Sequence, residues 1–220
     1  MLTINGGSSS VKFALFEPTT PRRRRLAGRI ERIGLDDAAL VLESGERRAV
    51  KAPDHAAALA IVLDLLEDRG ALADVAAAGH RIVHGGARHR DGTRVDAALR
   101  ADLGQLSLLD PDHLPGELAM IEALQQRCPN LPQFACFDTA FHASMPRAAQ
   151  LLPIARRFEA KGLRRYGFHG LSYEYLLREL VSVMTHDWLM ETQPSVLSLK
   201  MLVGFESRTV SPIEGGCQGA

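Results

Sequence analysis

Apolar and polar residues alternate near the start of the chain in the manner of β-strands. Residues 2–5 form a short apolar run, and Val11, Phe13 and Leu15 alternate with other residues after the Gly/Ser-rich segment 6–10. Because successive side chains of a strand point to opposite faces, this pattern predicts a hairpin with a small, hydroxyl-rich turn. Three further short strands are predicted, at residues 26–33, 38–43 and 47–51.

The first helix is predicted from an apolar stripe with helical spacing. Four apolar residues follow the i, i+3, i+4, i+7 rule, namely Leu59, Val62, Leu63 and Leu66. Asp54 is well suited to cap the start of this helix, and Gly70 closes it.

Beyond that helix, apolar strands alternate with helical segments. Residues 74–83 and 134–137 are predicted to be buried strands. Helices are predicted at residues 95–109 and 113–127, and again after Gly170. Strands and helices in this order predict an α/β fold with a mixed sheet.

The composition is that of an ordinary globular protein and gives no global attraction to a charged partner. Hydrophobic residues make up 46% and charged residues 24% of the 220 positions, and 26 basic residues balance 26 acidic ones. Aromatic residues do not cluster with the four-arginine run at residues 22–25, so a solvated loop is favoured over a nucleic-acid patch. We therefore expect no nucleic-acid partner.

Neither the start of the chain nor any apolar run predicts export or a membrane span. Residues 1–5 contain no basic region followed by an apolar run, and no uninterrupted apolar stretch approaches the roughly 20 residues that cross a bilayer. Cys128, Cys136 and Cys217 form no C-x-x-C pair, which favours reduced thiols over a disulfide or zinc. A cytoplasmic protein without membrane contact is expected.

The composition changes near the end of the chain. The last 40 residues hold two of the 26 basic residues, three of the six methionines and the only tryptophan. We therefore predict a domain at residues 1–180 and a divergent tail at residues 181–220, frameshifted or poorly ordered. A genuine but divergent segment is the alternative.

The turn at residues 6–10 has chemistry that suits a phosphate. Glycines let the backbone approach an anion closely, and the N–H groups and hydroxyls of the turn can donate to it. Lys12 follows and can place a point charge on a phosphate oxygen. The segment is not a Walker loop, because it lacks G-x-x-x-x-G-K-[ST] and no helix follows directly. An ordinary hairpin turn is the alternative.

Arg81 lies near the end of a predicted buried strand, where a guanidinium needs an anionic partner. Its planar fork suits a carboxylate or a phosphoryl group, with an internal salt bridge as the alternative. The nearby His80 and His84 have i, i+4 spacing, which on a helix would suggest zinc. On a strand followed by two glycines, metal ligation is disfavoured.

Asp138 and His169 are the remaining candidates for chemistry. Asp138 follows a predicted strand, where ligands bind in α/β sheets. It could hold magnesium through water, orient an arginine or handle a proton, and a cap is the alternative. His169 has Gly167 and Gly170 beside it, and an accessible imidazole can donate to a phosphoryl oxygen. A structural histidine is the alternative.

In their order and spacing, four of these segments resemble the successive motifs of the acetate kinase family. The segments are residues 5–13, 79–86, 137–146 and 165–170, and the likeness runs from residue 2 to about residue 180. The family belongs to the actin and sugar-kinase superfamily, whose ribonuclease H-like α/β domains are duplicated around a cleft. The resemblance implies that fold here, with the second domain largely missing.

The resemblance implies a phosphotransferase that moves the γ-phosphoryl of ATP to the carboxylate of acetate, or of propionate, and releases ADP. It implies magnesium as the cofactor and a family-type homodimer. Asn5 would help to hold the magnesium, and Ser8, Ser10 and Lys12 would face the nucleotide phosphates.

The resemblance also assigns roles to the other candidates. Arg81 would bind the substrate carboxylate and the transferring phosphoryl, Asp138 would be the active-site carboxylate, and His169 would stabilise the transition state. This agrees with the chemistry of the residues. A carboxylate acceptor is already ionised, so catalysis needs positioning and positive charge and does not need an activating base.

The sequence departs from the family pattern at several positions. Gly6 stands where the family usually has cysteine, and residues 109–111 replace a typical His-Asn-Pro. Leu171 and Tyr173 replace the usual threonine and histidine. After residue 180, the His-x-Gly-Asn-Gly phosphate segment, a second active-site arginine, the adenosine pocket and a late glutamate ligand are not found.

These departures leave two hypotheses, an acetate kinase by descent and an inactive remnant that at most binds an anion or a partner chain. A sugar- or glycerol-type kinase is disfavoured, because such an enzyme needs a base to deprotonate a hydroxyl. We expect the isolated 220-residue chain to have little or no kinase activity.

Overall fold

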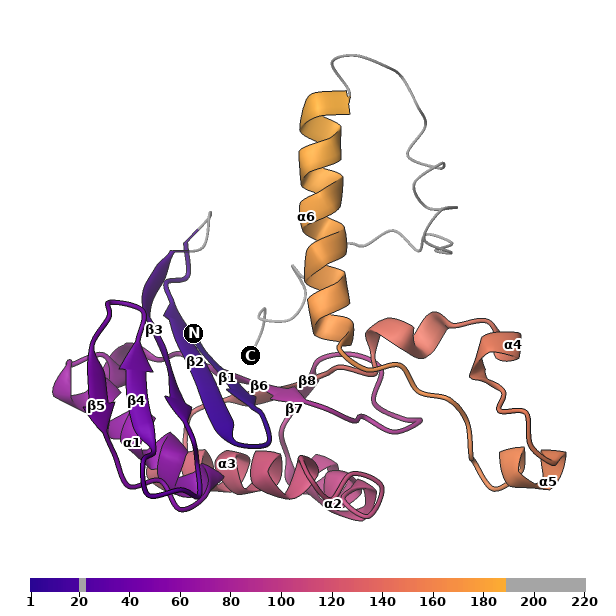
Figure 1. Cartoon of the computed structure of the whole chain (residues 1–220), viewed down its shortest axis with the longest axis horizontal. Coiled ribbons are helices and arrows are strands. Elements are labelled where there is room, and N and C mark those ends of the chain that lie inside the picture. The colour runs from indigo at the N-terminus through magenta and orange to yellow at the C-terminus, as the bar shows by residue number, and fades with distance from the viewer. Residues whose placement is uncertain (20–22, 189–220) are drawn as a thin grey trace. The chain divides into compact units, whose positions relative to one another are not determined.

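The computed structural model describes residues 1–19 and 23–188, and it confirms the predicted α/β fold with a mixed sheet (Figure 1). Within these residues, one eight-stranded sheet has the order β5-β4-β3-β2-β1-β6-β8-β7. The strands are Leu2–Gly6 (β1), Ser10–Phe16 (β2), Arg24–Glu31 (β3), Ala39–Leu42 (β4), Arg47–Ala49 (β5), Ala78–Ile82 (β6), Thr93–Arg94 (β7) and Gln133–Phe137 (β8). The first five strands form an antiparallel meander, whereas β1, β6 and β8 are mutually parallel.

Helices of very different length connect and follow these strands. The long ones are His55–Asp68 (α1), Ala97–Leu106 (α2), Leu114–Arg127 (α3) and Gly170–Trp188 (α6). The short ones are Leu72–Asp74 (η1), Phe141–Ser144 (η2), Arg147–Gln150 (α4) and Arg156–Glu159 (α5). The predicted cap of α1 is confirmed, because the Asp54 side chain accepts a hydrogen bond from the N–H of Ala57 at 2.8 Å.

Helices α1 and α3 lie against one face of the sheet (Figure 1). The alternating apolar residues of β1 and β2 point to that face and are buried with the apolar stripe of α1 and with Met120 and Leu124 of α3. Asn5 and Lys12, which alternate with them, are exposed on the opposite face. The hairpin pattern therefore predicted the two strands, and the structure shows that their polar face lies opposite the one packed on α1 and α3.

The predicted strand at residues 74–83 is wrong in its first part, because β6 begins only at Ala78. A strand extends as far as its partners do, and the two neighbours of β6 begin at Leu2 and Gln133. Ala78 donates to Pro132 O at 2.9 Å, so the hydrogen-bonded ladder starts there. The two-residue strand β7 was not predicted, since so short a segment has no alternation of its own.

The chain divides into two compact units, one from Met1 to Leu171 and another that begins at Ser172. Helix α6 crosses this boundary and runs on to Trp188. The predicted division between residues 180 and 181 stays a prediction, and residues 189–220 of the predicted tail lie outside the described residues. In the described part of the chain, each helix is too short or too polar to cross a bilayer.

Candidate active site

The parallel strands β6 and β8 deliver Arg81 and Asp138 to the same edge of the sheet. Their register places Arg81 opposite Cys136 and Ile82 opposite Phe137, so Asp138 follows one residue beyond the end of β8. The N–H of Asp138 donates to Ile82 O at 2.9 Å and fixes its backbone to the neighbouring strand. The carboxyl ends of parallel strands are where α/β sheets bind ligands.

The side chains of Arg81 and Asp138 form a charged pair at this edge. Nε and Nη2 of Arg81 both donate to Oδ2 of Asp138, at 3.0 and 2.5 Å, and Nη1 donates to Gly6 O at 3.2 Å. The Asp138 side chain is 3% exposed and the Arg81 side chain 17%. The internal salt bridge, which was the alternative for Arg81, is therefore present, and orienting an arginine is the one of the three roles open to Asp138 that this contact fits.

Strand register joins this pair to the opening hairpin. Asn5 of β1 lies opposite Lys12 of β2 on one side and opposite Arg81 of β6 on the other. Residues directly opposite each other share a face of the sheet, and neighbouring strands are about 4.8 Å apart, so the backbones of Lys12 and Arg81 are about 10 Å apart. Two cationic side chains thus flank an exposed amide on the open face of the sheet.

The turn between β1 and β2 is closed by its own backbone. The N–H of Gly7 donates to Ser10 O at 2.7 Å, and the ring Nε2 of His55 lies 2.6 Å from Gly7 O. Ser8 is exposed at the tip of the turn, and Ser10 shares the face of Lys12, two residues along β2. Because the Gly7 N–H is already used, it is not available to a phosphate at this turn.

The segment with His169 is fixed directly to the backbone of Asp138. The N–H of Gly170 donates to Asp138 O at 3.1 Å, and a Cβ at Gly170 would lie 2.0 Å from that same oxygen. The ring of His142 bonds Phe168 O at 3.0 Å and occupies the space that a side chain at Gly167 would need. His169 is exposed and has a φ of 58°, a left-handed conformation that is costly for a non-glycine residue.

The structure therefore brings Arg81 and Asp138 into contact, places Asn5 and Lys12 beside them by register, and anchors the backbone next to His169 on Asp138. Their predicted roles toward substrate, nucleotide and metal stay predictions.

A buried glutamate next to this cluster was missed in the sequence. Glu117 of α3 is 2% exposed, and both of its carboxylate oxygens accept from the N–H of Val83, at 3.2 and 3.1 Å. Burial raises its pKa to about 7, against the lowering effect of the Val83 N–H and of Arg81. Its spacing was the available signal, because Leu114 and Ile121, three residues before and four after, are fully buried.

The two histidines near Arg81 are held by different partners. Burial lowers the pKa of His80 to about 4, and its Nε2 lies 2.8 Å from Oε1 of Gln133. His84 accepts at Nδ1 from the N–H of Gly86 at 2.8 Å, so the ring proton of the neutral imidazole is on Nε2. Burial also lowers the pKa of His84, whose ring packs on Tyr166 at a centroid distance of 4.5 Å.

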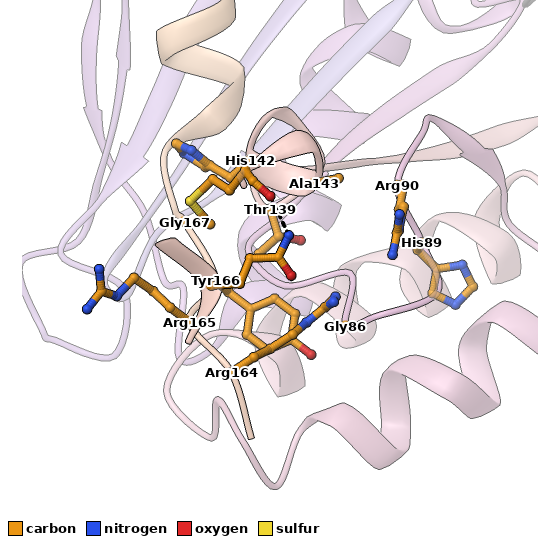
Figure 2. A pocket seen from close by; sticks show the side chains of 12 residues that line it. Gly86, His89, Arg90, Thr139, His142, Ala143, Arg164, Arg165, Tyr166 and Gly167 are labelled. Carbon is orange, nitrogen blue, oxygen red and sulfur yellow. Dashed lines mark hydrogen bonds between the residues drawn. The ribbon is translucent and has the colours of Figure 1, made fainter. Parts of the chain in front are cut away.

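A small cavity of about 20 Å³ lies among the loops that follow β6 and β8 (Figure 2). Figure 2 shows His89 and Arg90 on one side of it and Tyr166 with Arg164 on another, and Arg164 lies 4.7 Å above the Tyr166 ring. This volume is close to that of one water molecule. The cavity is lined by neighbours of the candidate residues and by none of the seven residues singled out in the sequence.

The described residues do not form a magnesium site by themselves. Asn5 offers one neutral oxygen, and Oδ2 of Asp138 is already occupied by Arg81. Residues 1–19 and 23–188 contain no group of three or more His, Cys, Asp or Glu side chains that could hold a metal ion. Magnesium usually takes most of its ligands from water and substrate phosphates, so a bound nucleotide would have to supply them here.

Comparison with known proteins gives one consistent family. A model described as the acetokinase family matches residues 1–191. The acetate kinase of Bacillus mycoides is 40% identical over 192 residues, which cover 84% of this chain and 48% of that protein. The acetate kinase of Dichelobacter nodosus is 39% identical over 187 residues, covering 83% of this chain and 47% of that protein.

Solved structures agree with the sequence relatives. A propionate kinase from Francisella tularensis superposes with a TM-score of 0.76 at 30% identity, covering 84% of this chain and 48% of the other. The acetate kinase of Porphyromonas gingivalis gives a TM-score of 0.74 at 30% identity, with 83% and 48% covered. The chain thus spans about half the length of the relatives it matches. The predicted resemblance and fold class are confirmed, and the chain belongs to the acetokinase family.

Proposed function

We propose that this chain carries one half of a phosphotransferase that moves the γ-phosphoryl of ATP to the carboxylate of acetate. The observation that supports this most is the row of Lys12, Asn5 and Arg81 across the open face of the sheet, with Arg81 held by Asp138. The family relatives act on acetate or propionate by their names. Acetate is proposed here, because the relatives with the higher identity are acetate kinases.

In the proposed reaction an acetate oxygen attacks the γ-phosphorus, and the bond to the oxygen that bridges the β- and γ-phosphates breaks. The products are acetyl phosphate and ADP, and no proton has to leave the acceptor. Arg81 binds the acetate carboxylate and the transferring phosphoryl, and His169 donates a hydrogen bond to the phosphoryl as negative charge spreads over it. Asp138 keeps the guanidinium fork in one orientation.

The nucleotide is proposed to lie along the hairpin. Ser8, Ser10 and Lys12 face its phosphates from the tip of the turn and the open face of β2. Magnesium enters with the nucleotide, and Asn5 is the one residue of this row that we propose to face it. A cytoplasmic location and a homodimer of the family type belong to the same proposal.

A fusion protein tests the proposal. Residues 1–180 would be joined to the part of the Bacillus mycoides acetate kinase that follows the position aligned with Leu180. Acetyl phosphate would be trapped as the hydroxamate with acetate, ATP and magnesium. We expect turnover in the fusion and its loss in a fusion with Arg81→Ala, whereas Arg88→Ala, at an exposed surface pair with Asp102, serves as the matched control.

The 220-residue chain alone is expected to show little or no turnover in the same assay. A well-folded fusion that is inactive, or one in which Arg81→Ala is as active as the unsubstituted fusion, would contradict the proposed function.

A further inference from the structure

Two backbone groups lose their ladder partners where β1 and β6 end, and two side chains replace those partners. Strand β1 ends at Gly6, whose carbonyl accepts from Nη1 of Arg81 at 3.2 Å. Strand β6 ends at Ile82, and the next N–H, that of Val83, donates to both oxygens of Glu117. Buried backbone groups need such partners. Glu117 therefore fixes the end of β6, the strand that contains Arg81.

Glu117 also contacts the guanidinium itself. Its Oε1 lies 3.7 Å from Nη1 of Arg81, and the two side chains are 2% and 17% exposed. Arg81 therefore sits between two buried carboxylates, Asp138 on one edge and Glu117 on the other. The Asp138 contact uses Nε and Nη2, which leaves Nη1 as the part of the fork that Glu117 and Gly6 O share.

We propose that Glu117 is a positioning residue for Arg81, and that an anion which binds at Arg81 draws a proton onto the Glu117 carboxylate. The proposal rests on the anion-binding role proposed for Arg81. With Glu117 ionised, the cluster of Arg81, Asp138 and Glu117 has one excess negative charge and repels an anion. With Glu117 protonated, the cluster is neutral, Val83 keeps an acceptor, and the repulsion is removed.

The surroundings of Glu117 support this linkage. Burial raises its pKa to about 7, so both protonation states are populated near neutrality. The charged and titratable groups that face it are Arg81 from β6, His113 and Asp110 from the segment before α3, and His55 from α1, whose ring lies against Gly116. Two of these are histidines, so a test must isolate Glu117 itself.

The substitution Glu117→Gln separates the contribution of the Glu117 charge from that of the neighbouring groups. Glutamine keeps an oxygen acceptor for the Val83 N–H but carries no charge at any pH. The readout is the side-chain Nε–H signal of Arg81 in NMR spectra of the full chain, assigned through its loss in Arg81→Lys. The probe is sulfate, a tetrahedral dianion that does not titrate near neutrality, added at constant ionic strength. A purely structural role, confined to the Val83 N–H, would survive the substitution unchanged.

We expect wild-type protein to bind sulfate at least about threefold more tightly near pH 6 than near pH 8. Glu117→Gln should bind at pH 8 as tightly as wild type does at pH 6 and should lose the Glu117-dependent part of the pH change. In wild type, the carboxyl carbon of Glu117 should titrate at a higher pH with sulfate than without it, a measurement that needs no variant. An unchanged Glu117 midpoint, or the same pH dependence in wild type and Glu117→Gln, would overturn the proposal.

If the proposed anion-binding role of Arg81 is wrong, the sulfate titration gives a different result. If sulfate shifts no Arg81 signal at any pH, the anion-binding role of Arg81 fails, and the linkage to anions fails with it. The positioning part is then judged on the ligand-free protein. There the Arg81 signal should follow the ionisation of Glu117 in wild type and not in Glu117→Gln, and an identical titration in both would refute that part as well.

Discussion

At the scale of single residues, the arrangement of donors on Arg81 explains why an arginine occupies this position. Its guanidinium bonds Asp138 with two nitrogens and Gly6 O with the third, so three fixed directions hold one side chain. A lysine has a single point charge on a flexible stem and cannot make these contacts together. Charge alone would therefore not preserve the site.

The first prediction follows from this geometry. In the fusion protein described above, Arg81→Lys should lower kcat/KM for acetate by about two orders of magnitude, comparable to the loss of one transition-state donor. Steady-state kinetics measure this, with Arg88→Lys as the matched control at an exposed pair. A loss in Arg81→Lys no larger than that in the control would show that the positive charge suffices.

The second prediction concerns the stability cost of Glu117. Its folded-state pKa of about 7 lies above the ordinary value of 4.5, so its protonated form stabilises the fold below about pH 4.5 and that contribution is lost as the pH rises through about 7. Glu117→Gln should match wild type at low pH and exceed it at pH 8 by up to about 3 kcal/mol. Urea unfolding at several pH values measures the difference.

His80 does not disturb this comparison. Burial lowers its pKa to about 4, so its contribution is present above about pH 6.5 and is lost as the pH falls, and it is the same in both proteins. A constant difference in unfolding free energy from pH 5 to pH 8 would show that Glu117 does not titrate with a raised pKa.

At the scale of elements, the sequence predicted the helices and strands whose formation depends on residues close together in the chain. The capped, striped helix α1 and the hairpin of β1 and β2 were predicted because their caps, turns and periodicity are all within a few residues. The start of β6 was not, since it depends on where β1 and β8 supply partners. Context from distant segments also explains Glu117, whose partner Val83 is 34 residues away.

In the candidate site, too, the sequence indicated single residues but not the contacts between distant segments. Arg81 and Asp138 were singled out separately as strand-end residues, and the sequence alone could not show that one would bind the other across 57 residues. Sequence reasoning also left open whether Lys12 and Arg81 share a face of the sheet. That depends on Asn5 lying opposite both, which is a matter of strand order and register.

The third prediction concerns the first residue of α6. Gly170→Ala would place a Cβ 2.0 Å from Asp138 O and 2.6 Å from Cβ of Phe141, so the segment must move away from Asp138. We expect a loss of about 1–3 kcal/mol in the free energy of unfolding.

Gly104→Ala is the matched control for this experiment. It lies in α2 with nothing within 4 Å of the added Cβ, and it should gain up to about 1 kcal/mol. Urea unfolding separates the two, and a Gly170→Ala protein as stable as the Gly104→Ala protein would show that the segment is not fixed on Asp138.

At the scale of the whole molecule, we propose that the chain supplies one side of the cleft that its resemblance to the family implies. It spans about half the length of its relatives, and the row of Lys12, Asn5 and Arg81 faces away from the core of α1 and α3. The family match reaches residue 191, while the proposed change to a divergent tail is at residue 181. The encoding DNA tests the tail directly.

The fourth prediction is that another reading frame, read past the codon of Leu180, restores a His-x-Gly-Asn-Gly segment. Such a segment would show that the composition change at residues 181–220 is a frameshift. Three frames without it would favour the alternative, a genuine but divergent segment.

The central claim is that the hairpin, the two strand ends and the segment at His169 form one site for a phosphorylated anion. The most direct measurement is an NMR titration of the full chain with acetyl phosphate, following side-chain signals of Lys12, Asn5, Arg81 and His169. We predict that all four move together and fit one dissociation constant. Signals of Lys12 or His169 that stay still while Arg81 responds, or that fit a separate constant, would contradict the single site.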